Sequence, residues 1–310
     1  MFRKILQKFS YLVAGLALAV QIFVILAKTN FFFELFTHYA LYYAIFWSIF
    51  ALICATRKHF ACALILTLIA SINIAEISPY FARTEAITTN SQANETVTIL
   101  SNNFYYKNQN TDDFLELIKE ENPDIFIVHE AGHIWISLLS ELIKTYPSLY
   151  LTKETGVHGI LIGSKTPGIF TEIPLGEAFG LEFIPTNGAF KILAVHPEAP
   201  FTQKFAKARN TQFQDITTYI RNQNDTNNKI VIIGDFNCTP WSPYFTDLLK
   251  AGLKDAQIGF GLSPTWHSGL SPFKIQIDHA LVTDSVAVDS FKVLRQVAGA
   301  DHLPIEVKVH

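Results

Sequence analysis

The stretch KIVIIGDFNCTPWSP, residues 229–243, joins a strongly apolar run to a cluster of polar residues. Four consecutive Ile and Val residues, 230–233, predict a buried β-strand. Asp235 and Asn237 follow directly, although a carboxylate is costly to remove from water. A charged side chain at the exit of a core strand needs a partner. A ligand site at the edge of a sheet would provide one.

Apolar runs alternate with amphipathic segments along the rest of residues 97–310. Helices are predicted over 134–144, over 203–222 and from Thr111 onward, with Thr111 as the cap. The alternation is typical of a mixed α/β sheet domain with helices outside the sheet. The strands that we predict are 97–100, 124–128, 191–195, 229–233, 274–282 and 305–309.

Polar residues of a similar kind follow four of these runs, lie within a fifth and stand just before the final one. A single polar strand end is usually a turn or a cap that meets water. Six such ends, rich in Asn, Asp, Glu and His, predict instead a shared site at one edge of the sheet. They are Ser101-Asn102-Asn103, His129-Glu130, His196-Pro197, Asp235-Phe236-Asn237, Asp278-His279 and Asp301-His302.

These residue types suit one chemistry. Oxygen ligands suit a hard cation such as Mg²⁺, and the three cysteines, Cys54, Cys62 and Cys238, show no disulfide framework or zinc-ligand spacing. His and Asn side chains can donate to a phosphoryl group in its transition state. A further carboxylate can orient or deprotonate a water. Together they predict metal-assisted hydrolysis of a phosphoester.

The chain resembles the endonuclease/exonuclease/phosphatase family in a series of motifs. In order they are ILSNNFYYKN, PDIFIVHE, LAVHPEAP, IIGDFNCTPWSPYF, SPTW, QIDHALV and GADHLPIEVKV. The likeness covers about residues 95–310 and is strongest to bacterial members with membrane spans before the catalytic domain. It implies a four-layer α/β sandwich of two packed sheets flanked by helices. It also implies Mg²⁺- or Mn²⁺-dependent hydrolysis by in-line attack of water, without a covalent intermediate.

The resemblance assigns three residues to the metal. Glu130 matches the principal Mg²⁺ ligand, and Asp301 the last carboxylate on the metal side. Asn103 matches the asparagine beside the metal and the phosphate. We choose it over Asn102 because the family pattern has a second asparagine five positions on, here Asn108.

Five further residues match catalytic groups of the family. Asp235 would position or deprotonate the attacking water, and Asn237 would hold the phosphate. His196 would contact the phosphoryl group. His302 would donate to the transition state, with Asp278 orienting it.

Three histidines lie beside these positions without an assigned catalytic role. His129 stands where the family usually has a glutamine, and His267 where proline is usual. Neither change removes a group that the mechanism needs. His279 is expected to be a packing neighbour of Asp278.

The N-terminal residues 1–79 differ from the rest. Runs 11–27, 39–55 and 60–77 contain no Lys, Arg or Asp, and each is near the lower length limit for crossing about 30 Å of hydrocarbon. We predict three transmembrane helices, of which the first could instead be a cleaved signal peptide. Polar residues 80–96 are predicted to be a linker before the catalytic domain, residues 97–310.

Basic residues are distributed unequally around these spans. Arg3, Lys4 and Lys8 precede the first, and Arg57 and Lys58 lie between the second and third. The positive-inside rule then places these residues in the cytoplasm. The catalytic domain would lie on the periplasmic side of a bacterial inner membrane.

The charge of the catalytic part bears on the substrate. Residues 1–79 hold 6 of the 24 Lys and Arg and 2 of the 27 Asp and Glu, which leaves a formal balance of −7 beyond them. The clearest basic cluster, Lys204, Lys207 and Arg209, reads equally well as the solvated face of a helix. A small or lipid-linked phosphoester is therefore favoured over nucleic acid. The bilayer is the other partner, and no protein partner can be inferred. A DNase I-like nuclease and a catalytically inactive binding domain stay open as alternatives.

Overall fold

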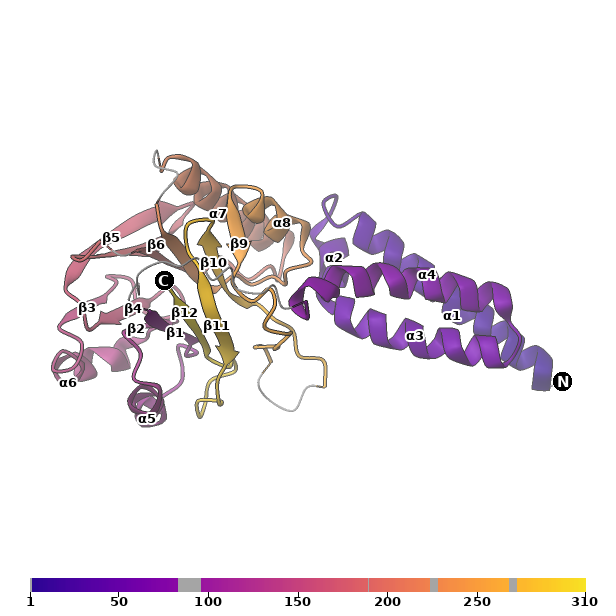
Figure 1. The fold of residues 1–310 in the computed structure, drawn as a ribbon, viewed down its shortest axis with the longest axis horizontal. Coiled ribbons are helices and arrows are strands. Elements are labelled where there is room, and N and C mark those ends of the chain that lie inside the picture. The colour runs from indigo at the N-terminus through magenta and orange to yellow at the C-terminus, as the bar shows by residue number, and fades with distance from the viewer. Residues whose placement is uncertain (1, 83–95, 189, 224–227, 268–271) are drawn as a thin grey trace, which may run out of the picture.

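The computed structural model describes residues 2–82, 96–188, 190–223, 228–267 and 272–310. Its chain forms a bundle of three long N-terminal helices that leads into a two-sheet α/β domain (Figure 1). The bundle meets this domain at one end only. Most of the predicted linker, residues 80–96, falls outside the described residues.

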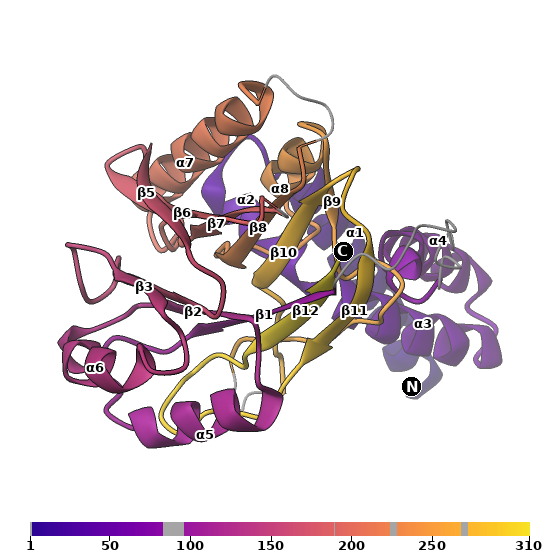
Figure 2. The same ribbon diagram turned by 60° about the vertical axis from the view of Figure 1, so that its left-hand side comes forward.

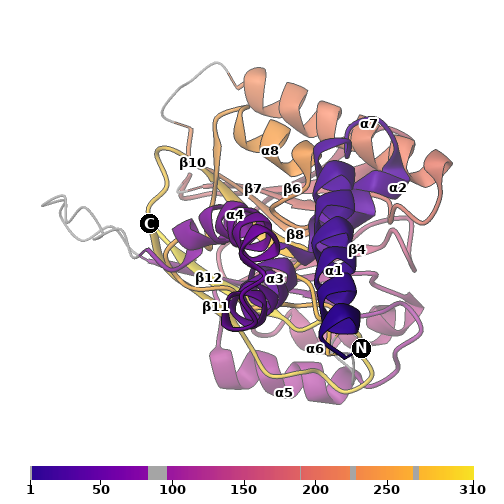
Figure 3. The same cartoon turned by 90° about the vertical axis from the view of Figure 1, so that its right-hand side faces the viewer.

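Three N-terminal stretches are helical, long and apolar enough to cross a membrane, as the sequence predicts. The helices run side by side in alternating directions, so the start of the first and the turn between the other two lie at the far end (Figures 1 and 3). At that end Ser10 Oγ lies 2.7 Å from His59 Nδ1. The helices are α1 (Phe2–Ile25), α3 (Ala40–Thr56) and α4 (Phe60–Ile77).

A short segment between α1 and α3 packs on the catalytic domain. This inter-span segment, residues 30–39, contains α2 (Phe31–Glu34) and the 3₁₀ helix η1 (Leu35–Tyr39). The Glu34 carboxylate accepts hydrogen bonds from Arg209 Nη2 at 2.6 Å and from Ser242 Oγ at 2.7 Å. All three residues are buried.

Two more buried hydrogen bonds hold the bundle on the domain. His38 Nδ1 of the inter-span segment lies 3.0 Å from Thr239 Oγ1. After α4, the 3₁₀ helix η2 (Ser78–Tyr80) ends with Tyr80, whose hydroxyl donates to Asp255 Oδ2 at 2.8 Å. The N-terminal helix bundle is therefore docked on the two-sheet domain, a contact that the sequence analysis did not foresee.

The described part of the two-sheet domain contains twelve strands, grouped in two sheets, and several helices. The first sheet contains β1 (Val97–Asn103), β2 (Ile125–His129), β3 (Ser148–Leu151), β4 (Ile160–Ser164), β11 (Val288–Val293) and β12 (Ile305–Val309). The second contains β5 (Gly168–Leu175), β6 (Ala178–Pro185), β7 (Lys191–Val195), β8 (Ile230–Asp235), β9 (Leu253–Asp255) and β10 (Asp278–Thr283). The helical residues form α5 (Thr111–Glu121), η3 (His133–Leu138) with α6 (Leu139–Leu142), α7 (Gln203–Arg221) and α8 (Pro243–Leu249).

The two six-stranded mixed sheets pack face to face, which confirms the predicted four-layer sandwich. Their orders are β11-β12-β1-β2-β4-β3 and β5-β6-β7-β8-β10-β9. Helices α5 and α6 cover the outer face of the first sheet, and α7 and α8 that of the second (Figure 2). Ile99, Ile127, Ile192 and Val231 belong to the apolar core between the sheets. Burial of such side chains stabilises each by about 1.5–3 kcal/mol.

Several elements differ from the prediction. The predicted helix 134–144 is split into η3 and α6, because an isolated helix of this length is marginal and tertiary packing of the buried Trp135 decides its shape. Thr111 is the first helical residue rather than the cap, which is Asn110. The strand expected over 274–282 begins at Asp278; before it, Ile275 forms only an isolated bridge with Trp266.

Replacing Glu34 should destabilise the protein. Glu34→Ala leaves the guanidinium of Arg209 buried without its carboxylate, a loss of about 3–5 kcal/mol in the free energy of unfolding. Lys28→Ala removes the exposed Lys28–Asp247 ion pair and should cost about 1 kcal/mol or less. Denaturant unfolding of the full chain in detergent measures both. Equal losses in the two variants would contradict the docking role of Glu34.

Candidate active site

The six polar strand ends lie together where the two sheets meet. Parallel pairing places the ends of β1 and β2 side by side, and likewise those of β7 and β8. Antiparallel pairing sets Asp278, the first residue of β10, opposite Asp235, the last of β8. A cavity of about 560 Å³ opens there. It is lined by six predicted site residues, namely Glu130, His196, Asp235, Asn237, Asp301 and His302.

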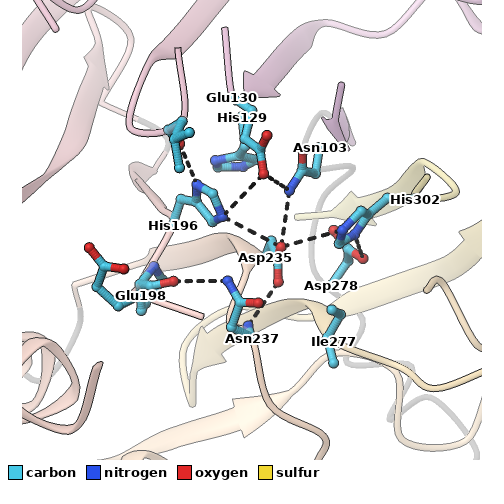
Figure 4. Close-up of polar contacts among 12 residues, drawn as sticks. Asn103, His129, Glu130, His196, Glu198, Asp235, Asn237, Ile277, Asp278 and His302 are labelled. Carbon is cyan, nitrogen blue, oxygen red and sulfur yellow. Dashed lines mark hydrogen bonds and ion pairs between the residues drawn. The ribbon is translucent and has the colours of Figure 1, made fainter. Parts of the chain in front are cut away.

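Asp235 lies at the centre of the cluster (Figure 4). Its Oδ2 accepts a hydrogen bond from Asn103 Nδ2 at 3.0 Å and lies 3.6 Å from the Nε2 atoms of both His196 and His302. Its Oδ1 accepts from the backbone amide of Asn237 at 2.8 Å. Asn103 itself does not line the cavity, but it contacts Asp235, which does.

The glycine of the Gly-Asp-Phe-Asn motif allows this approach. Gly234 has φ of +151°, and a Cβ there would lie 2.0 Å from the carbonyl oxygen of Val195 and 2.9 Å from His129 Nε2. Any larger residue would force β7 and β8 apart. His129 itself is buried, and burial is the main cause that lowers its pKa to about 3. It is therefore neutral and bonds to Ser101 Oγ at 3.1 Å.

His302 is held as a cation by two carboxylates. Its Nδ1 donates to Asp278 Oδ2 at 2.8 Å, so its Nε2 faces Asp235 and the cavity. Burial alone would lower the pKa of His302, but Asp278 and Asp235 raise it to about 10. The imidazolium is thus a hydrogen-bond donor at neutral pH.

His196 is oriented in a similar way, by a hydrogen bond on the side of its ring away from Asp235. Its Nδ1 lies 2.9 Å from the carbonyl oxygen of Val157, which leaves Nε2 toward Asp235 and Glu130 at 3.6 and 3.9 Å. Burial opposes protonation, but these two carboxylates raise the pKa of His196 above its ordinary value. A second donor therefore faces the same carboxylate.

Asp235 stays ionised despite its burial. Burial would raise its pKa, but the charges of His302 and His196 and the backbone amide of Asn237 bring it below the ordinary range. Asn237 has φ of 50°, a left-handed conformation that asparagine tolerates, and its Nδ2 donates to the carbonyl oxygen of Pro197 at 2.9 Å.

Glu130 provides a second carboxylate at the cavity. It has φ of 56°, which is uncommon for a glutamate and points to a functional constraint. Its Oε1 accepts from Asn103 Nδ2 at 3.0 Å and its Oε2 from the backbone amide of Tyr106 at 3.1 Å. Asn103 Oδ1 accepts from the amide of Tyr105, so the nitrogen of Asn103 faces the site. In this orientation the amide nitrogen of Asn103 supports the carboxylate of Glu130.

Two carboxylates that the resemblance assigns to a metal line the cavity. Glu130 and Asp301 both line the cavity and offer only oxygen atoms. Asp235, Asp278 and His302 also place one ligand atom each within 4.8 Å of one another. Within that second group, Asp278 Oδ2 already accepts a hydrogen bond from His302 Nδ1 at 2.8 Å.

The structure corrects the prediction that Arg209 lies on the solvated face of a helix. Lys204 and Lys207 are exposed, but Arg209 is wholly buried and paired with Glu34. The helical spacing of the sequence already indicated burial of Arg209, because it lies on the same helix face as the buried residues Ala206, Phe213 and Ile216.

The sequence analysis also missed part of the cavity wall. Leu35, His38 and Tyr39 of the inter-span segment line the cavity together with Phe201 and Phe205. No motif marks these residues, because the contact depends on how the membrane region docks.

His279 has a packing role. Its Nε2 lies 3.0 Å from the carbonyl oxygen of Cys238, and its ring packs against Phe236 and Phe245. Cys238 is a buried free thiol. Both residues belong to the layer between the second sheet and its helices.

A model of the Endonuclease/Exonuclease/phosphatase family matches residues 87–302. The chain belongs to this family. The match contains every residue that the motifs single out, from Asn103 to His302. The two-sheet sandwich is thus the fold of this family. No curated protein sequence matches the chain.

Solved structures share the fold of the family. A 3' phosphatase, NExo, from Neisseria bound to a product DNA hairpin has a TM-score of 0.57 at 18% identity, over 68% of this chain and 98% of that one. TDP2 of D. rerio with a single-strand DNA product has 0.58 at 14%, over 70% and 100%. A mannosyl-6-phosphatase of Bacteroides thetaiotaomicron has 0.52 at 16%, over 69% and 99%. At these identities the likeness concerns the fold alone.

Asp278→Asn should lower the pKa of His302 from about 10, because it removes the carboxylate bonded to Nδ1. Because the pKa of His302 is raised in the folded protein, protonation of His302 stabilises the fold fully at pH values below its ordinary pKa of 6.5. This stabilisation is lost as the pH rises through about 10. The variant should therefore lose stability at neutral pH. NMR titration of the histidine rings in the metal-free protein measures the shift, with Asp284→Asn as an exposed control. An unchanged titration of His302 would contradict the assignment.

Proposed function

We propose that this member of the family is a membrane-anchored, metal-dependent phosphoester hydrolase that uses an activated water. One observation carries the proposal. The ionised Asp235 lies within 3.6 Å of the Nε2 atoms of both His196 and His302, beside Glu130 in the same cavity. The arrangement offers one acceptor for a water and two donors for a phosphoryl oxygen.

The residues on the Glu130 side would hold the metal. Glu130 and Asp301 would bind Mg²⁺, or Mn²⁺, with several waters completing its coordination. Asn103 would steady Glu130 through its 3.0 Å hydrogen bond. When bound, the ion would polarise a phosphoryl oxygen and offset the charge of the transition state.

The remaining groups would perform the attack. Asp235 accepts a hydrogen bond from the water and takes its proton as the new bond from oxygen to phosphorus forms. The ester bond between phosphorus and the leaving oxygen breaks on the opposite side. His302, positioned by Asp278, and His196 donate to the oxygens that gain charge, and Asn237 holds the phosphate at the cavity floor.

Loss of these groups should remove turnover without unfolding the protein. Asp235→Asn and His302→Ala should each lower phosphoester hydrolysis by about 10²-fold or more. Chelation with EDTA should abolish it and Mg²⁺ restore it. The assay uses the full chain in detergent on plasmid DNA, phospholipid vesicles and soluble phosphoesters. The exposed Asp284→Asn serves as control. Activity that survives EDTA or Asp235→Asn would refute the mechanism, and inert wild type throughout would favour a binding domain.

The structure also supports an orientation in the membrane. Lys4, Lys8, Arg57 and Lys58 lie at the end of the bundle away from the catalytic domain, where Ser10 contacts His59. By the positive-inside rule this end is cytoplasmic. We therefore place the catalytic domain on the periplasmic side of a bacterial inner membrane.

Protease added to intact spheroplasts should then digest residues 97–310, and the same domain should be protected in inverted vesicles. A cytoplasmic protein from the same cells reports leakage. Protection in spheroplasts with digestion in inverted vesicles would reverse the orientation.

A further inference from the structure

The catalytic cavity has an apolar wall as well as a polar floor. We define the apolar wall as Leu35, Tyr39, Phe201 and Phe205, which line the same cavity as Asp235. Their exposed fractions are 38, 36, 79 and 39%. Large apolar side chains exposed together beside a cavity mark a surface for a ligand or a membrane.

The wall lies at the edge of the predicted bilayer. Tyr39 directly precedes Ala40, the first residue of α3, and Leu35 lies five residues before Ala40. At about 2 Å per residue in a 3₁₀ helix, Leu35 lies within about 10 Å of the start of α3. The buried Glu34–Arg209 pair fixes this segment on the catalytic domain. The cavity would therefore open at the level of the lipid head groups.

The charges of the lining narrow the class of substrate. Among the described residues that line the cavity, none is Lys or Arg. A protein that binds polymeric nucleic acid neutralises several phosphates with such side chains. Here His196, His302 and Asn237 form a floor for one phosphoryl group. A single phosphoryl group joined to an apolar body satisfies both sides of the cavity.

We propose that the substrate is a lipid phosphoester of the adjoining leaflet, whose hydrocarbon chain lies against the apolar wall. This inference rests on the proposed phosphoester hydrolase function. It assigns to Leu35, Tyr39, Phe201 and Phe205 the selection of substrates with a hydrocarbon chain. The membrane region thereby contributes part of the substrate site, and the catalytic domain contributes the chemistry.

Binding of alkyl phosphates to the full chain in nanodiscs tests the inference. Each fully buried methylene tightens binding about fourfold, so decyl phosphate should bind at least about tenfold more tightly than butyl phosphate. Leu35→Ser and Phe205→Ser should each reduce this ratio severalfold. Ile169→Ser, at an apolar position on β5 that is 67% exposed, lies outside the lining and should keep the ratio. Partitioning of decyl phosphate into the disc is the same for every variant, so differences between variants report the wall.

The outcomes separate the two proposals. If Leu35→Ser and Phe205→Ser keep the wild-type ratio, or if wild type shows no preference for decyl phosphate, the lipid substrate is refuted. Failure of wild type to bind either probe refutes it as well. His302→Ala tests the underlying function, because it should weaken binding of both probes by a similar factor. If His302→Ala binds both probes as tightly as wild type does, and wild type hydrolyses none of the esters, the proposed hydrolase function itself is refuted.

Discussion

The buried charge of Asp235 is the constraint on which the catalytic end of the sandwich depends. A carboxylate that is 1% exposed costs several kcal/mol unless it is paired and hydrogen-bonded. Its partners come from both sheets: Asn103 at the end of β1, His302 before β12, and His196 after β7. The apolar core between the sheets fixes their separation, and the polar cluster fixes their alignment at this end. Only rigid strand ends can hold four groups around one carboxylate within such distances.

The sequence predicted this part because strand geometry is local. Alternation along β1 sends neighbouring side chains to opposite faces, so Asn103 can face the site while Asn102 cannot. Parallel pairing then carries each polar exit to the same edge. Likewise, the glycine before Asp235 follows from the close approach of β7 and β8. Periodicity and motif order thus predicted the strands β1, β2, β7, β8, β10 and β12 and the polar residues near their ends.

What the sequence did not predict depends on distant partners. Arg209 and Glu34 are 175 residues apart, and either alone looks like an ordinary charged residue. Burial of the pair follows only from the packing of α2 against α7. The strands β3, β5 and β6 were missed for a different reason. Several of their residues are half-buried with mixed polarity, as along β5, so their pattern lacks the continuous apolar run of β8.

A docked membrane region acts differently from a flexible tether. A tether raises the effective concentration of the site near the bilayer equally for every membrane-bound substrate. A wall that belongs to the cavity changes the difference in affinity between substrates, which is what specificity requires. The ion pair joins the two parts directly, because Arg209 Nη1 also lies 3.5 Å from the backbone carbonyl oxygen of Asn237. The inter-span segment and the loop that carries Asn237 are therefore packed on the same guanidinium. The cavity lining extends across both parts of the chain, although the groups assigned to the proposed chemistry lie in only one.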